Sequence, residues 1–193
     1  MYVSTRTIAT PAAYAVAALS VVYAVVYLGV VKPSGGTNLT AVLATDLFIA
    51  LSGIIVTIVA ATVGERIAGA EGSWVQLVGV GWALLSATHG AFAFAADLGD
   101  VSVPQLASTD PRGFATFGLA GLWMIVVGLL ARQGRGGLPR GLGALAVAAG
   151  LDLVLLFLAT LFASDTLVTV FGGLAAVVLG PAFWMWTGSA LQR

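Results

Sequence analysis

The chain has 193 residues, of which 60% are hydrophobic and only 8% are charged, and its formal net charge is zero. The charged share is roughly a third of that of a soluble domain, so a soluble fold is excluded because it would leave large apolar patches in water. The balanced charge gives no reason to expect a nucleic-acid partner, and the absence of cysteine excludes thiol nucleophiles, iron–sulfur ligation and disulfides.

Six apolar runs are long enough to cross a bilayer as helices, which takes about 20 residues. They span approximately residues 9–31, 39–63, 74–97, 112–131, 139–163 and 166–190. The first run is too long for the core of a signal peptide, and the runs lack the alternation of transmembrane strands. We therefore predict an all-α fold, a polytopic membrane protein whose six transmembrane helices form one bundle over residues 1–193.

The charges that flank these runs are distributed unevenly between the two sides of the membrane. Six helices would place Arg6, Arg66, Arg132, Arg135, Arg140 and Arg193 on one side, and only Lys32 and Arg112 on the other. The positive-inside rule then predicts that both termini are cytoplasmic. The segment between the third and fourth helices, which contains Asp97, Asp100 and Asp110, becomes an acidic outer loop.

Three ionisable residues lie within the predicted helices at one depth. With a rise of about 1.5 Å per residue and an apolar slab of about 30 Å, Asp46, His89 and Asp152 share a layer in the outer half of the membrane. Tyr23 and Tyr27 of the first helix can supply hydroxyls at a similar height. Because a charged group facing lipid costs several kcal/mol, we expect these residues to face inward and to meet one another. This polar layer is a candidate ligand or proton site.

The polar layer admits several functional interpretations. Asp46, His89 and Asp152 can simply pair and hold the bundle together, or they can carry protons in a small transporter or proton-coupled carrier. A metal-dependent membrane enzyme has less support, because no paired-histidine motif is present. His89 can also give one axial bond to a haem or chlorin, as in a pigment-binding subunit. The sequence requires no cofactor or metal and contains no complete catalytic set.

The last run carries a stripe of small residues followed by a proline. Gly172, Ala176 and Gly180 recur every four residues, which is typical of a surface where a neighbouring backbone approaches closely. Pro181 has no N–H to donate to the carbonyl of Val177 and is expected to bend the helix. We interpret the stripe as helix packing, with a hinge as the alternative.

The segment "GPAFWMWTGSALQR", after the glycine-rich last helix, resembles the end of a family of small bacterial six-helix membrane proteins of unknown function. The resemblance covers about the last eighty residues and depends on a proline, aromatic residues and a glycine near the final inner interface. It implies a multi-pass protein of the bacterial inner membrane, and it brings no catalytic residue.

These observations favour a non-enzymatic membrane protein. We expect an accessory or scaffold subunit of a membrane complex, or a binder of lipid or of a small hydrophobic ligand. The expected partners are the lipid bilayer and, for an accessory subunit, other membrane subunits or further copies of the chain. The carrier is the alternative from a different functional class.

Overall fold

The computed structural model describes residues 5–67, 69–99 and 111–192, with side chains at 7–67, 69–99 and 116–192. Its helices are α1 (Thr5–Val26), α2 (Leu39–Ile67), α3 (Gly69–Asp97), α4 (Pro111–Arg132), α5 (Arg140–Leu161), α6 (Asp165–Leu174) and α7 (Gly180–Leu191). Two π-helical segments, η1 (Tyr27–Val31) and η3 (Ala175–Leu179), extend α1 and join α6 to α7; η2 (Arg135–Gly137) is a short 3₁₀ turn. The described chain is all-α, with six helices when α6, η3 and α7 are taken as one.

Five of the six helices are long and apolar enough to cross a membrane. They are Thr7–Val31, Leu39–Ile67, Gly69–Asp97, Arg140–Leu161 and Asp165–Leu191, whereas the described part of α4, Thr116–Arg132, is apolar but shorter. The largest difference from the sequence prediction is the start of α3, at Gly69 and not at residue 74. Glu71 lies in this first turn, where its negative charge interacts favourably with the helix dipole, so α3 continues beyond its apolar part.

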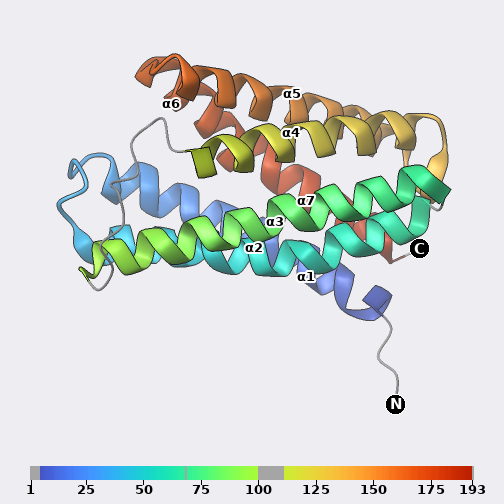
Figure 1. Cartoon of the computed structure of the whole chain (residues 1–193), viewed down its shortest axis with the longest axis horizontal. Helices are drawn as coiled ribbons and strands as arrows, with labels where there is room; N and C mark the ends of the chain where they lie inside the picture. Colours follow the sequence, from blue (N-terminus) through green and yellow to red (C-terminus); the bar gives the residue numbers. More distant parts are fainter. Residues whose placement is uncertain (1–4, 68, 100–110, 193) are drawn as a thin grey trace.

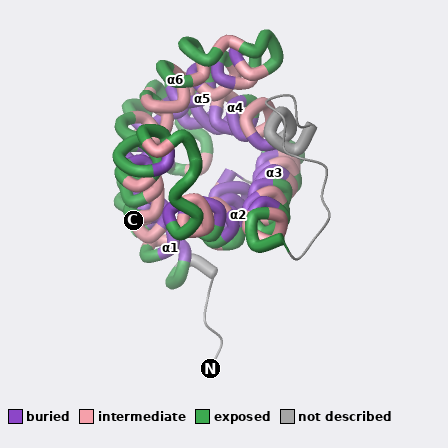
Figure 2. The backbone as a smooth tube through the Cα atoms, turned by 90° about the vertical axis from the view of Figure 1, so that its left-hand side faces the viewer, coloured by how far each residue is buried: buried purple, intermediate pink, exposed green. Residues whose placement is uncertain are grey.

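The helices form a closed ring in which each packs against its neighbours in the sequence. Figure 1 shows the helices running side by side, and Figure 2 shows the ring viewed nearly along them. Contacts between α1 and α7 close the ring, so the first and last helices are neighbours. At this closure the Tyr14 and Ser189 hydroxyls lie 3.1 Å apart, and Gln192 Nε2 donates to the Tyr14 hydroxyl at 3.3 Å.

The two ends of the bundle differ in charge. α1 begins and α7 ends at the same end, which also holds the α2–α3 and α4–α5 connections (Figure 1). We call this the basic end, since its described arginines, Arg66, Arg132, Arg135 and Arg140, outnumber its glutamates, Glu65 and Glu71. The opposite end, here the Lys32 end, also carries Asp97 and Asp165. Arg193, Asp100 and Asp110, and the side chains of Arg6 and Arg112, lie outside the described residues.

Arg66 ties the end of α2 to the end of α7. Its Nη1 donates to the Ala190 carbonyl at 3.0 Å and its Nη2 donates to the Leu191 carbonyl at 2.6 Å. A guanidinium at a helix C-terminus both satisfies open carbonyls and interacts favourably with the helix dipole. The basic end is therefore held together by a charged contact between elements far apart in the sequence.

Glycines bring the backbones of α4 and α5 into direct contact. A Cβ added at Gly150 would lie 2.5 Å from the Gly121 carbonyl oxygen, and one at Gly143 would lie 2.6 Å from that of Gly128. Each of these glycines is seven residues from the other on its own helix. Close backbone approach gives the van der Waals packing on which helix association in a membrane depends. The α4–α5 pair is therefore tightly packed.

The α2–α3 pair is packed in the same way. A Cβ at Gly90 would lie 2.6 Å from the Asp46 carbonyl oxygen, and one at Gly72 would lie 2.6 Å from the carbonyl oxygen of Gly64. The bundle thus contains two hairpins of contiguous sequence whose helices are in backbone contact. The remaining helices, α1 and the α6–α7 run, complete the ring.

Candidate ligand-binding cavity

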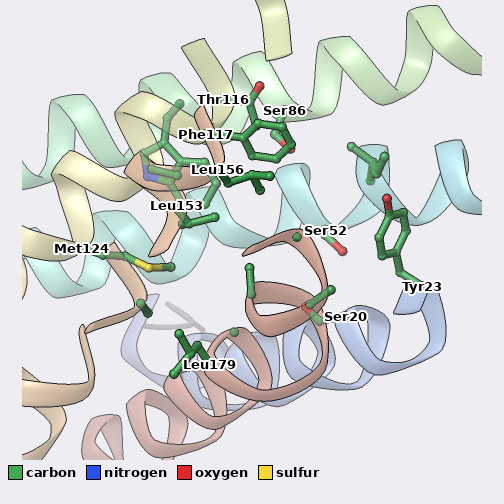
Figure 3. A pocket seen from close by; sticks show the side chains of 18 of the residues that line it. Ser20, Tyr23, Ser52, Ser86, Thr116, Phe117, Met124, Leu153, Leu156 and Leu179 are labelled. Atoms are coloured by element: carbon green, nitrogen blue, oxygen red, sulfur yellow. The ribbon is translucent and has the colours of Figure 1, made fainter. Parts of the chain in front are cut away.

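A cavity of about 270 Å³ lies inside the ring, and side chains converge on it from every one of the six helices (Figure 3). We call it the central cavity. Its wall includes Ser20, Tyr23, Ile49, Ser52, Trp82, Ser86, His89, Thr116, Phe117, Met124, Leu153, Leu156, Gly172, Ala176, Leu179, Gly180 and Trp184. The ring of helices therefore encloses space at its centre in addition to packed side chains.

The wall of the central cavity is mainly apolar. Its polar groups are a few hydroxyls, the His89 imidazole and the indole N–H groups of Trp82 and Trp184, and the described lining includes no aspartate, glutamate, lysine or arginine. The Ser20 hydroxyl already donates to the Val16 carbonyl of its own helix at 2.9 Å. Small-molecule sites typically combine a hydrophobic lining with a small number of polar groups that orient the ligand. The chemistry of this wall suits a molecule that is mostly hydrocarbon.

A second space, of about 420 Å³, lies between the α1–η1 helix and α6 toward the Lys32 end. We call it the vestibule; its wall includes Tyr23, Ala24, Tyr27, Leu28, Lys32, Phe117, Leu156, Asp165, Val168, Thr169, Gly172, Gly173 and Ala176. Tyr23, Phe117, Leu156, Gly172 and Ala176 belong to both walls, so the two spaces adjoin. The vestibule therefore leads from the Lys32 end of the bundle to the central cavity.

An aromatic cluster closes the central cavity toward the basic end. Trp123 is fully buried, and its ring lies 6.0 Å from that of Trp82, 6.3 Å from Phe183 and 6.4 Å from Trp184. The Trp123 indole N–H donates to the Val75 carbonyl at 2.7 Å, which fixes the ring between α3 and α4. The cavity is thus approached from the Lys32 end and blocked by packed rings at the other.

Three residues of the predicted polar layer lie on these walls. Tyr23 and His89 line the central cavity, and Tyr23 and Tyr27 line the vestibule. The two tyrosine rings are stacked, with centroids 5.6 Å apart and planes 7° apart. Tyr23 of α1 and Tyr27 of η1 therefore form a continuous aromatic surface from the vestibule toward the central cavity.

The two aspartates of the polar layer lie away from the described lining. Asp46 is buried between α2 and α3, where its carboxyl group interacts electrostatically with that of Asp97. Within the described part of the chain, no three His, Asp or Glu side chains lie close enough to hold a metal ion. The structure therefore does not gather the layer into a metal site.

Asp152 is also buried, and neither of its carboxyl oxygens has a hydrogen-bond partner among the described residues. On the same face of α5, Gly141 lies against Trp186 and Leu156 lies against Gly172. Asp152 lies between these two contacts and so faces the α6–α7 run near η3. The expected pairing with Asp46 and His89 is not seen, because the Asp152 carboxyl makes no hydrogen bond to them and they belong to α2 and α3, which are not neighbours of α5 in the ring.

The small-residue stripe of the last helix lies on the cavity wall. Gly172, Ala176 and Gly180 all line the central cavity, and a Cβ at Gly172 would meet only Leu156 Cδ1, at 3.7 Å. The missing side chain at Gly172 therefore adds to the space of the central cavity. Gly180 donates its N–H to the Ala175 carbonyl across the π-helical turn. Pro181 follows directly, so the π-helical turn lies next to the proline at which the sequence predicts a bend.

The sequence interpretation did not identify Lys32 and Thr169 as site residues. Lys32 Nζ donates to Thr169 Oγ1 at 2.8 Å across the vestibule, so this bond joins the end of η1 to α6. Lys32 is the only lysine of the chain and follows an apolar helix directly, which is the signal available in the sequence. Thr169 gives no such signal, because its role depends on the packing of the last helix against the first.

The fold and the cavity define a multi-pass helical membrane protein with internal space between its helices. No family model, curated protein or solved structure matches the chain. The resemblance of the C-terminal segment to small bacterial six-helix membrane proteins therefore stays an expectation from the sequence.

Proposed function

We propose that the protein binds a small hydrophobic molecule in the central cavity. The observation that carries the proposal is a mainly apolar space of about 270 Å³ with side chains from all six helices on its wall. Protein interiors are close-packed, and atoms that line a void lose dispersion contacts. A bound hydrophobic molecule supplies the missing contacts.

Binding without chemical conversion is the activity that these residues support. The central cavity brings His89 and Tyr23 to its wall, but its described lining contains no carboxylate to act with them. The same arrangement suits an accessory subunit that presents a hydrophobic ligand to other membrane subunits or to further copies of the chain.

Filling the central cavity from its wall tests this function. Gly172→Phe is expected to place an aromatic ring in the central cavity. Because a Cβ at residue 172 meets no atom closer than 3.7 Å, the helix can carry the larger side chain without moving. We expect saturable quenching of tryptophan fluorescence by bromine-labelled hexadecanol in nanodiscs, because Trp82 and Trp184 line the cavity. Gly172→Phe is expected to weaken this binding at least tenfold.

Gly81→Phe is the matched control for this experiment. Gly81 is a helical glycine outside both cavity walls, and a Cβ there meets nothing within 4 Å. This variant is expected to bind hexadecanol as the parent protein does. Equal saturable quenching in the parent and in Gly172→Phe would remove the central cavity as the binding site.

A carrier is the second candidate, and the two π-helical segments favour it. η1 and η3 belong to the helices that border the vestibule, and π-helical turns are frequent at functional sites. A carrier would have to open the central cavity alternately to the two sides of the membrane, through the vestibule at the Lys32 end and through the aromatic cluster at the basic end. Movement of hexadecanol across liposome membranes, accelerated by the protein and lost in Gly172→Phe, would support the carrier.

We also propose that the basic end is cytoplasmic, in the inner membrane of a bacterium, as the positive-inside rule predicts. Because the chain has no cysteine, Thr37→Cys at the Lys32 end and Gln133→Cys at the basic end each give a single exposed thiol. In intact cells a membrane-impermeant maleimide is expected to label Thr37→Cys and not Gln133→Cys. Permeabilised cells should show both labelled, and the reverse pattern in intact cells would invert the orientation.

A further inference from the structure

We propose that the ligand is a single-chain amphiphile with an anionic head group. Its head binds at Lys32 in the vestibule, and its hydrocarbon chain extends past Tyr23 into the central cavity. This inference rests on the proposed ligand-binding function and adds the chemical class of the ligand and its orientation.

The shape of the two spaces favours a long, narrow molecule. Their lining on the last helix runs from Asp165 in the vestibule to Trp184 at the far end of the central cavity. At about 1.5 Å per residue this stretch is roughly 28 Å long. A cavity that is long relative to its volume fits an extended chain better than a compact ring system.

The path between the two spaces is lined mainly by carbon, and the Tyr23 hydroxyl is the polar side-chain group among the residues that the two walls share. The shared wall consists of the Tyr23, Phe117 and Leu156 side chains together with the small residues Gly172 and Ala176. The small residues leave room on one side, and the stacked Tyr23 and Tyr27 rings give a flat apolar surface on another. A hydrocarbon chain can lie along the apolar faces of these rings.

The charge of the head group follows from Lys32. Its ammonium donates a hydrogen bond to Thr169 Oγ1 at 2.8 Å, which holds it on the vestibule wall. An ammonium group has three donors, so beside the bond to Thr169 it can bind an oxygen anion in the vestibule. A carboxylate or a phosphate monoester at the end of the chain supplies such an anion.

Asp165 carries a negative charge in the vestibule, so its substitution should change the binding of an anion in the opposite direction to substitution of Lys32. It lies on the vestibule wall and in the first turn of α6, where a negative charge interacts favourably with the helix dipole. Its carboxylate repels an anionic head group at Lys32. Removal of the Asp165 charge should therefore strengthen binding of an anionic amphiphile, whereas removal of the Lys32 charge should weaken it.

The experiment compares three probes of one chain length, palmitate, hexadecyl phosphate and hexadecanol, in bromine-labelled form with the tryptophan-quenching measurement. Lys32→Gln is expected to weaken palmitate and hexadecyl phosphate at least tenfold and to leave hexadecanol unchanged. Lys32→Arg, which keeps the charge, is the control and should bind all three as the parent does. Asp165→Asn should bind the two anionic probes several-fold more tightly.

Unchanged hexadecanol binding also shows that each variant is folded. Equal effects of Lys32→Gln on all three probes, or no effect on any, would overturn the anionic head group while leaving the proposed function intact. If the parent protein bound none of the probes, the proposed function itself would fail. Binding of only one anionic probe would support the inference and identify the head group as carboxylate or phosphate.

Discussion

Gly150→Ala is expected to lower the free energy of unfolding by about 1–3 kcal/mol, the usual cost of overpacking a close contact. The added Cβ would lie 2.5 Å from the Gly121 carbonyl oxygen and 2.8 Å from the Ile125 nitrogen. Both are backbone atoms, so relief requires α4 and α5 to move apart. Thermal unfolding of the purified protein in detergent would show this as a lower midpoint.

Gly118→Ala is the matched control, because it makes the same substitution in the same helix pair. The atoms nearest to its Cβ would be those of the Phe157 ring, at 3.6 Å, which is ordinary van der Waals contact. Alanine in a helix interior is favoured over glycine by about 0.5–1 kcal/mol, so this variant should be as stable as the parent or more stable. Equal stability of Gly118→Ala and Gly150→Ala would show that the close α4–α5 contact contributes nothing.

Asp152→Leu is expected to raise the free energy of unfolding by about 1–2 kcal/mol, the desolvation cost of a buried group without a partner. Asp152 is only 5% exposed, and neither carboxyl oxygen has a hydrogen-bond partner among the described residues. Leucine has the same branching and needs no partner. Thermal unfolding would show a higher midpoint, and hexadecanol binding should persist because Asp152 lies outside both described cavity walls.

Asp152→Asn provides the comparison, because its amide is also polar and needs partners in the same place. It should therefore lack the gain in stability that leucine brings. A loss of stability in Asp152→Leu would mean that the carboxyl group has a stabilising partner. Loss of proton-coupled transport with unchanged stability would instead assign Asp152 to a carrier.

Hydropathy predicted where the helices lie but not how they are arranged around the ring. The second run was predicted to begin at residue 39, where α2 begins, because the end of an apolar stretch is a property of local sequence. The start of α3 was missed because its first turn, with Glu71, is polar. The contact of Tyr14 with Ser189 joins opposite ends of the chain, and no local pattern encodes it.

The sequence predicted how deep the candidate site residues lie in the membrane, but it predicted the direction of their side chains only in part. Counting residues along each helix placed Tyr23 and His89 at a level where the structure has a cavity. The same count placed Asp152 in the same layer, but its direction depends on how α5 is rotated by its glycine contacts with α4. The spacing of four at Gly172, Ala176 and Gly180 predicted close helix packing, but these residues line the central cavity, and the closest described backbone contacts are made by glycines spaced seven residues apart on α4 and α5.

The two glycine-packed hairpins have a consequence for how the protein is made. Each of α2–α3 and α4–α5 is contiguous in sequence, so its helices can associate as soon as both have been inserted by the translocation machinery. The α6–α7 run is synthesised after both hairpins, and only then can it meet α1 and complete the wall that borders the vestibule. A hydrophobic molecule already dissolved in the membrane can therefore be enclosed during biogenesis, before any passage through the finished ring is needed.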